Sequence, residues 1–347
     1  MNKQNTPIQP IQIIGTQRSG SNLLRVMLNE LNEVAAPHPP HILKTFQPLV
    51  PEYGDLTQRE NFRLLVDDVC RFVECNPVEW DGVSLDRQSV LSGCRQPTLL
   101  EIFRVVYETL ANSHGARFWC CKSMANGHFF HAIENAGIRP FYIHLVRDGR
   151  DVASSFRKVA VGDKHIFHLA KKWKEDQSAS FKVIETVGAK RGIVVHYEEL
   201  ISTPEVVMKK ICGLLGVPYT DRVLGYYQSE ESRHTASAGY MWHNLSQPIL
   251  AGNCGKYAQT MDPEELALFE YIAGGELERY GYERVADKRD FQLSPKVLSE
   301  FEAENERLKD AIRSSHHLRI DISKRKKQEE LIKSIKNRKH ILKLIQA

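Results

Sequence analysis

The sequence predicts an α/β fold in three layers, with a central parallel sheet between two layers of helices and a helical extension at the C-terminus. Two observations predict the sheet and its cover: short apolar runs typical of buried strands, and segments with helical spacing between them. Such alternation favours a parallel sheet covered on both faces. The apolar runs are 11–14, 118–121, 141–146 and 193–196, and the main helical segments are 99–111, 166–187 and 206–215.

The first predicted strand leads into a glycine loop and then into a helix. Gly15 ends the apolar run, Gly20 closes the loop, and Ser21 or Asn22 is expected to cap a helix whose apolar face begins at Leu23. Backbone N–H groups at the start of a helix attract anions. The loop therefore predicts a phosphate-binding site, with an ordinary strand-to-helix turn as the alternative.

This loop has the spacing of a Walker A loop without its lysine. The distance from Gly15 to Gly20 matches the first half of GxxxxGK[ST], but Ser21 and Asn22 stand where that pattern has the lysine and the magnesium-binding hydroxyl. Arg18 supplies a cation from the loop instead. A phosphate-bearing donor, bound without a Walker lysine, is therefore expected.

A cationic or aromatic residue follows each predicted strand. Arg18, Lys122, Arg147 and Tyr197 come after the first, second, third and fourth strands, respectively. In open parallel sheets, ligands bind outside the carboxyl ends of the strands, so these side chains are expected at one edge. Ser155 follows Arg147 by eight residues on the next helix. An arginine and a serine so placed can hold one phosphate from two sides.

The composition is that of a soluble globular protein. No apolar run approaches the roughly 20 residues that span a bilayer, so no transmembrane segment is expected. Residues 1–10 are polar and lack the apolar core of a secretory signal. The seven cysteines form no CxxC pair and are expected to be free thiols, which predicts a cytoplasmic protein. No metal site is expected from the cysteine and histidine spacing.

The charge is unevenly distributed along the chain. Residues 316–347 contain ten Lys or Arg and three acids, which gives this segment +7, whereas the whole chain carries +4. The rest of the chain is therefore mildly acidic. A basic segment of this length is more often a solvated helix face than a nucleic-acid site, so no nucleic-acid partner is expected.

Residues 286–347 are predicted to form a basic helical extension. Seam positions recur there at spacings of 3, 4, 3, 4 and 3, with one Asn inside the seam. Such seams suit a coiled coil that joins a homodimer, or helices that pack on the body of their own chain. The first seam is Leu298, Phe301, Asn305, Leu308, Ile312 and Ser315, and the second is Leu331, Ile335, Arg338, Leu342 and Ile345.

Together these motifs resemble the sulfotransferases that use 3′-phosphoadenosine 5′-phosphosulfate (PAPS), and most of all their bacterial and tyrosylprotein branch. The resemblance covers residues 11–282 and implies a sulfotransferase domain at 11–285 after a polar segment at 1–10. The residues implied to bind the donor are Thr16, Gln17, Arg18, Ser19, Gly20, Ser21 and Asn22 for the phosphosulfate, Arg147 and Ser155 for the 3′-phosphate, Tyr197 on the adenine side, and Lys256 in a late loop.

The resemblance implies in-line attack of an acceptor hydroxyl on sulfur, with Arg18 and Lys122 as catalytic cations and no metal. The branch often has a glutamate base after its first helix, but this chain has Pro-His-Pro-Pro-His at 37–41. His38 is therefore the first candidate base and His41 the second, since imidazole titrates near neutral pH. The proline-rich segment 36–54 around them is expected to be an irregular loop.

Two alternatives to the sulfotransferase remain at this point. A P-loop kinase of a small molecule or nucleotide would share the architecture, and a scaffold with a degenerate donor site would share the loop. Ser21 and Asn22 disfavour the kinase, because it needs the Walker lysine and hydroxyl. The acceptor stays open among carbohydrate, lipid, metabolite and protein tyrosine, with Trp242 and His243 as candidates to line its pocket.

Overall fold

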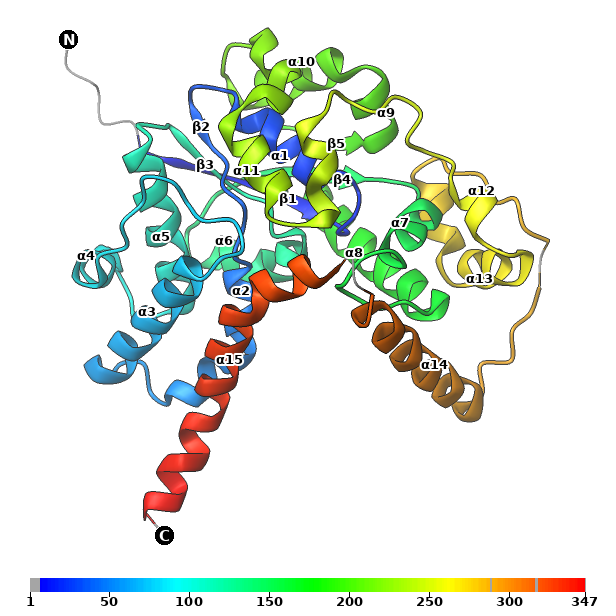
Figure 1. Ribbon diagram of the computed structural model, residues 1–347. Coiled ribbons are helices and arrows are strands. Elements are labelled where there is room, and N and C mark those ends of the chain that lie inside the picture. Colours follow the sequence, from blue (N-terminus) through cyan, green and yellow to red (C-terminus); the bar gives the residue numbers. More distant parts are fainter. Residues whose placement is uncertain (1–6, 288, 316–317, 347) are drawn as a thin grey trace.

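The chain folds around one five-stranded parallel sheet. The computed structural model describes residues 7–287, 289–315 and 318–346, with side chains described as far as residue 338 (Figure 1). Neighbouring strands pair in the order β2-β3-β1-β4-β5, and every pair is parallel. The predicted α/β class with a central parallel sheet is confirmed. The strands are β1 (Gln9–Gly15), β2 (Val34–Ala35), β3 (Phe118–Cys121), β4 (Phe141–Val146) and β5 (Gly192–His196).

The four predicted strands are all present, and the structure adds β2. β3 and β4 have the predicted bounds, while β1 extends the apolar run by two residues before it and one after it. β2 is two residues long and pairs with β3 at the edge of the sheet. A segment so short carries no periodic signal, which is why the sequence did not predict it.

The side chains of β1 show how the sheet is covered, because successive residues of a strand point to opposite faces. Ile11 and Ile13 belong to a buried cluster that includes Leu28 of α1 (Ser21–Asn29) and residues of α10 (Pro204–Leu215). Ile14 packs on the other face in a cluster with Val183 of α8 (Ile166–Val187). Helices on both faces make the three predicted layers (Figure 1).

Further helices surround these layers. Those of the first half are α2 (Ile42–Phe46), α3 (Arg59–Glu74), α4 (Arg87–Gly93), α5 (Leu99–Ser113) and α6 (Phe130–Asn135). Those of the second half are α7 (Gly149–Phe156), α9 (Tyr197–Ser202), α11 (Glu230–Ser237), α12 (Tyr257–Thr260), α13 (Pro263–Arg279), α14 (Pro295–Arg313) and α15 (Arg319–Gln346). Four 3₁₀ helices complete the described elements: η1 (Gln47–Tyr53), η2 (Met124–Phe129), η3 (Asp221–Gln228) and η4 (Tyr240–Ser246).

The expectation of an irregular loop at 36–54 is wrong for its second half. Helices α2 and η1 occupy 42–53, and only the stretch before them is irregular. Pro48 lies in the first turn of η1, where the missing N–H of proline costs no hydrogen bond. His41 immediately precedes α2, so the short helix fixes the backbone of one candidate base.

The first helix of the C-terminal extension packs on the body of its own chain. The ring of Phe301 in α14 lies 4.4 Å from the ring of His165, and the Asn305 side chain is buried. Asn305 Oδ1 accepts hydrogen bonds from the backbone N–H groups of Lys164 and His165, at 2.8 and 3.1 Å. The Asn within the first predicted seam therefore serves an intrachain contact.

The second helix of the extension also packs on the body. Leu331 and Ile335 of α15 join the largest hydrophobic cluster, together with residues of α3 and α5, and the Arg338 guanidinium donates to Asp68. Leu342 and Ile345 of the predicted seam lie outside the residues whose side chains are described. Of the two alternatives, packing on the body is the one seen for the described seam residues, while a homodimer stays a prediction.

Candidate active site

The glycine loop after β1 turns sharply into α1. The N-cap residue of α1 is Gly20, with φ +85°, and no side chain caps the helix. The expectation that Ser21 or Asn22 provides the cap is therefore wrong. A Cβ atom at Gly20 would collide with the ring of Tyr197, which lies directly against the loop. Only glycine combines this close approach with a left-handed backbone.

The residues that follow the predicted strands meet at the carboxyl edge of the sheet. Arg18, Lys122, Arg147 and Tyr197 line one cavity of about 970 Å³. Other sequence-predicted residues that line it are Gln17, Gly20, Ser21, Asn22, His38, His41, Ser155 and Lys256, and the two acceptor-pocket candidates Trp242 and His243. The structure thus brings together residues as far apart in the chain as Gln17 and Lys256, which are 239 positions apart.

Two loop residues lie differently from the rest. Thr16 and Ser19 are buried and do not line the cavity. The Thr16 hydroxyl accepts a hydrogen bond from Gln177 Nε2 at 3.1 Å. The Ser19 hydroxyl is buried without a hydrogen-bond partner among the described residues. Any contact of these two residues with a donor would therefore be made through their backbone N–H groups.

Arg147 is held by contacts on several sides. Its Nη1 donates to the carbonyl oxygen of Arg18 at 3.2 Å and its Nη2 to that of Asn253 at 2.9 Å. The guanidinium lies 4.4 Å above the ring of Tyr197 and 3.6 Å from a carboxylate oxygen of Asp151. Its Nε is buried without a hydrogen-bond partner in the described part of the chain. An orphaned N–H beside a cavity is suited to an anion such as a phosphate.

The late loop is tied to the same group of residues. Asn253 Nδ2 donates to the Tyr197 hydroxyl at 2.7 Å, and Asp151 accepts the backbone N–H groups of Gly255 and Tyr257 at 2.7 and 2.9 Å. The loop that carries Lys256 is therefore fixed next to the start of α7. Lys256 itself is exposed and lines the cavity.

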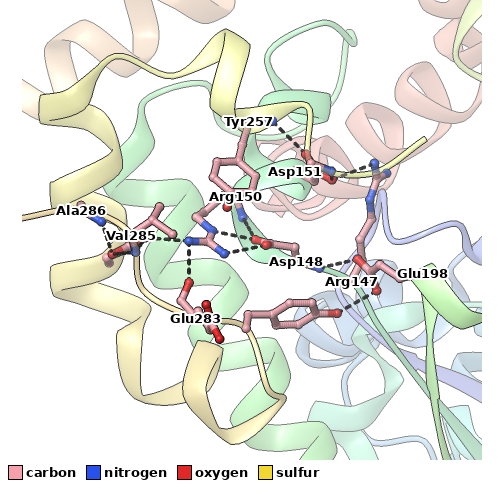
Figure 2. A network of polar contacts seen from close by, with 12 residues as sticks. Arg147, Asp148, Arg150, Asp151, Glu198, Tyr257, Glu283, Val285 and Ala286 are labelled. Carbon is pink, nitrogen blue, oxygen red and sulfur yellow. Dashed lines mark hydrogen bonds and ion pairs between the residues drawn. The ribbon is translucent and has the colours of Figure 1, made fainter. Parts of the chain in front are cut away.

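Behind Arg147, a buried polar network holds the start of α7 in place (Figure 2). Asp148 caps the helix and accepts two hydrogen bonds from the Arg150 guanidinium, at 3.0 and 2.7 Å. Arg150 also pairs with Glu270 at 2.6 Å, and Glu198 accepts the backbone N–H of Asp148 at 3.2 Å. These acids position the loop that carries Arg147 and do not face the cavity.

Arg18 has a left-handed backbone, with φ +72°. Its Nε donates to the Ser155 hydroxyl at 3.1 Å, which links the glycine loop to α7. Burial, and then the neighbouring charge of Arg147, lower the pKa of Arg18 to about 10. The guanidinium is still cationic at neutral pH, and a bound anion would relieve the cost of burying it.

Lys122 is the most strongly perturbed cation of the site. Its side chain is 6% exposed, and burial followed by the charges of Arg25 and Arg18 lowers its pKa to about 7. Arg25 itself is fully buried and is neutralised by an ion pair with Glu231. A lysine crowded by cations in a cavity indicates a place where a negative charge binds or develops.

The two candidate bases differ in their surroundings. Burial, and then the charge of Lys122, hold the pKa of both His38 and His41 well below the usual value, so both rings are neutral at pH 7. The Asn76 amide nitrogen faces His38 Nδ1 at 3.3 Å while donating to two backbone carbonyls. A hydrogen on His38 Nδ1 would point at this amide nitrogen, so the surroundings favour the tautomer with the proton on Nε2, in which Nε2 is a donor.

His41 is better suited to accept a proton. Its Nδ1 lies 3.1 Å from the Ser123 hydroxyl, which can accept the Nδ1–H and leave Nε2 with a free lone pair. Its backbone is left-handed, with φ +62°, and Arg18 is the other described non-glycine residue with a positive φ. Such strained backbones are concentrated at functional sites. The two strained residues here are both predicted catalytic residues.

Arg325 and Gln328 of α15 are among the residues of the cavity wall that sequence reasoning missed. The buried face of α15 runs through Asp321, Arg325, Gln328, Leu331 and Ile335, at helical spacing. Its first half is polar, so a search for apolar periodicity finds the seam only from Leu331 onward. Among the described residues, no cluster of three or more His, Cys, Asp or Glu could hold a metal ion.

Comparison with known proteins identifies the family. A model of the "Sulfotransferase family" matches residues 10–221, which is more than half of the chain. The chain belongs to the sulfotransferase family. The match includes β1 to β5 and the loops with Arg18, Lys122, Arg147 and Tyr197, but it ends before the late loop and before the C-terminal extension.

A curated relative is similar to a shorter part of the chain. Protein-tyrosine sulfotransferase A from Caenorhabditis elegans is 34% identical over 92 residues, which is 25% of this chain and 24% of that protein. The chain thus aligns with about a quarter of the length of this curated relative.

Two solved structures share the fold. The sulfotransferase domain of the Synechococcus PCC 7002 olefin synthase has a TM-score of 0.51 at 22% identity, covering 79% of this chain and 98% of that one. The sulfotransferase domain from the curacin biosynthetic pathway has a TM-score of 0.51 at 19% identity, covering 80% and 99%. Both are sulfotransferase domains of nearly the same extent as the body of this chain.

Proposed function

We propose that this protein transfers the sulfuryl group of PAPS to an acceptor hydroxyl. The observation that carries the proposal is the convergence of Arg18, Lys122, Arg147 and Ser155 on one cavity at the carboxyl edge of the sheet. A nucleotide with phosphate groups at two positions needs two separate anion sites. The glycine loop at the start of α1 supplies one, and Arg147 with Ser155 supplies the other.

When bound, the donor supplies an activated sulfuryl group whose transfer leaves adenosine 3′,5′-bisphosphate (PAP). The side chains of this chain then have three tasks. Arg147 and Ser155 hold the 3′-phosphate, and Tyr197 orients the nucleotide beside the loop. Arg18 and Lys122 stabilise the negative charge on the leaving phosphate, which is the main contribution a protein makes to such transfers. His41 Nε2 takes the acceptor proton, with His38 as the second candidate.

The kinase alternative is disfavoured by the same loop. A kinase loop has a lysine that reaches the outer phosphates, followed by a hydroxyl that binds magnesium. This chain has Ser21 and Asn22 at those two positions. The acceptor class stays open among carbohydrates, lipids, metabolites and protein tyrosines. We propose a cytoplasmic location, because all seven cysteines are free. No helix in the described part of the chain is both long and apolar enough to cross a membrane.

Calorimetric titration of the full chain tests the proposal. PAP and PAPS should bind without magnesium, whereas magnesium-ATP should bind weakly or not at all. The variant Arg147→Gln should bind PAP more weakly, while the matched control Arg222→Gln, at an exposed arginine away from the cavity, should bind it normally. Binding of magnesium-ATP without binding of PAP would overturn the proposal. Labelled PAPS incubated with fractions of each acceptor class would then identify the substrate.

A further inference from the structure

The C-terminal extension forms part of the cavity wall. Arg325 and Gln328 of α15 line the same cavity as Arg18 and Lys122. Figure 1 shows α15 starting over the centre of the body and running past α2, with its C-terminal end projecting beyond the body. Both residues lie beyond position 221, where the match to the family model ends. The sulfotransferase core that the family model describes is therefore supplemented, in this chain, by a side chain from a separate helix.

Contacts on both sides of Arg325 fix its position along α15. Before it, Asp321 is 1% exposed and lies against Gly239, where any Cβ atom would collide with its carboxylate. After it, Gln328 Nε2 donates to the carbonyl oxygen of Phe72 at 2.9 Å, and Ile335 is buried in the largest hydrophobic cluster. Packing on this scale holds the helix, and with it Arg325, in one place.

A second anchor lies further along the same helix. Arg338 donates to both carboxylate oxygens of Asp68, at 2.7 and 3.1 Å. Asp68 is fully buried and also accepts the hydroxyl of Tyr53 at 2.8 Å. A bidentate pair with a buried carboxylate is costly to separate. The packing of α15 on the body is therefore a stable part of the fold.

The Arg325 guanidinium has few hydrogen-bond partners where it lies. Its carbon is 5.5 Å from the ring centroid of Trp242, and its Nη2 lies 3.7 Å from the sulfur of Met241, a weak acceptor. Its Nε is buried without a hydrogen-bond partner among the described residues. Burial lowers its pKa, and the nearby carboxylate of Asp321 offsets part of this effect. An arginine left in this state is ready to bind an anion.

Arg325 lies in the part of the cavity that we call the transfer end, which contains Arg18, Lys122, His38 and His41. Its guanidinium carbon lies 5.5 Å from the ring centroid of Trp242, and that ring lies 4.6 Å from the ring of His38. The charge of Arg325 also makes a small contribution, behind burial and other charges, to the lowered pKa values of Arg18 and Lys122. It also acts on His38 and His41, again behind larger effects of burial and of Lys122. These four residues are the predicted catalytic residues. The ligand group nearest to Arg325 would then be the sulfuryl group, since the nucleotide is held from the other end by Arg147.

We propose that Arg325 binds the sulfuryl group of the donor, so that the C-terminal helix completes the active site. This inference rests on the proposed function. The sulfuryl group presents three oxygens that share negative charge while the sulfur–oxygen bond to the phosphate breaks and the bond to the acceptor oxygen forms. A guanidinium can donate two parallel hydrogen bonds to such a group. Arg325 would act beside Arg18 and Lys122.

The difference between PAPS and PAP isolates this contact, because PAP lacks the sulfuryl group. Calorimetric titration of the Arg325→Met variant should show PAPS binding weakened by about tenfold or more, since a hydrogen bond to a charged group is lost. PAP affinity should stay within about twofold. Lys327→Met, an exposed site two residues along the same helix, should change neither affinity. Arg325→Lys should retain part of the PAPS affinity.

Each outcome of the titration has a distinct meaning. Failure of the wild-type chain to bind either nucleotide would overturn the proposed function itself. Normal binding of both nucleotides by Arg325→Met, or an equal loss for both, would overturn the role of Arg325 and leave the proposed function standing. If Arg325→Met does not fold, as judged by its melting curve, Arg325→Lys provides the same comparison with the positive charge retained.

Discussion

The cavity has a donor end around Arg147 and Tyr197 and a transfer end around Lys122 and Arg325. The two ends differ in how their charges are balanced. At the donor end, Arg147 is surrounded by a carboxylate, two carbonyl oxygens and an aromatic ring. At the transfer end, Lys122 is buried among cations, and the described hydrogen-bond partner of Arg325 Nη2 is the sulfur of Met241, a weak acceptor. The donor end is a preformed receptor, whereas the transfer end is electrostatically incomplete without an anion.

This difference indicates that one end mainly binds the donor and the other mainly accelerates the reaction. A preformed, charge-balanced site costs little to fold and mainly provides affinity. A cluster of incompletely compensated cations costs stability, and it is used best where negative charge develops during a reaction. Substitutions at the donor end should therefore change binding, and substitutions at the transfer end should change turnover.

The largest effect should come from the base. His41→Ala should lower kcat by about 10²–10⁴-fold, because the acceptor hydroxyl would lose its proton acceptor. His38→Ala, with its Nδ1 facing an amide nitrogen, should lower kcat much less. Release of PAP from PAPS, measured with an acceptor-containing fraction, gives both rates. Full activity of both variants would place the base elsewhere, and a larger loss for His38→Ala would reverse the order of the two candidates.

Next in size is the effect of Arg18. Arg18→Ala should lower kcat by about 10²–10³-fold, as expected when one preorganised donor to the developing charge is removed. PAP affinity should change less, because Arg147 and Tyr197 remain. The comparison requires kcat from PAP release and PAP affinity from calorimetry on the same sample. A loss confined to PAP affinity would move Arg18 from the transfer end to the donor end.

Arg147 should show the opposite pattern. Arg147→Ala should weaken PAP binding by about 10–100-fold through the loss of a charge-assisted contact. At saturating donor, kcat should fall little. The stacked ring of Tyr197 and the Asp151 carboxylate would lose their partner, so a melting curve is needed to separate local disorder from lost affinity. Unchanged PAP affinity in a folded variant would remove Arg147 from the donor site.

The sequence predicted the cavity residues at the edge of the sheet better than those on α15, for a physical reason. Arg18, Lys122 and Arg147 each follow a strand directly, so local patterns place them at the same edge of a parallel sheet. Arg325 reaches the cavity only because α15 docks on elements more than 200 positions earlier, through Asp68 and the cluster around Ile335. No local pattern encodes that docking.

Local prediction was also wrong about the cap of α1, and it did not establish which side chains of the glycine loop face the cavity. Ser21 and Asn22 are good capping residues, yet Gly20 takes the cap position because the Tyr197 ring leaves no room for a side chain. Thr16 and Ser19 belong to the predicted loop, but its sharp turn points their side chains into the protein. Both outcomes depend on contacts with residues distant in the sequence.

The smallest predicted effect concerns the stability of the protein without ligand. In the folded chain Lys122 has a pKa of about 7, below its ordinary value of 10.5, so between these pH values the unfolded chain holds more protons than the folded chain. Stability contributed by this site therefore rises with pH across that window, and the cost of the buried charge is largest below pH 7. Lys122→Met should raise the melting temperature by roughly 2 °C or more at pH 6, with a smaller gain at pH 9.

The same variant connects stability to function at the transfer end. Lys122→Met should lose turnover while gaining stability, because the charge that destabilises the ligand-free chain is the one that the bound anion needs. Melting curves at pH 6, 7.5 and 9, with Lys327→Met as an exposed control, measure the gain. A gain of equal size at every pH would show that packing, and not the buried charge, is responsible. A loss of stability at pH 6 would mean that the cations of the transfer end are already compensated within the folded chain, which would contradict the comparison of the two ends.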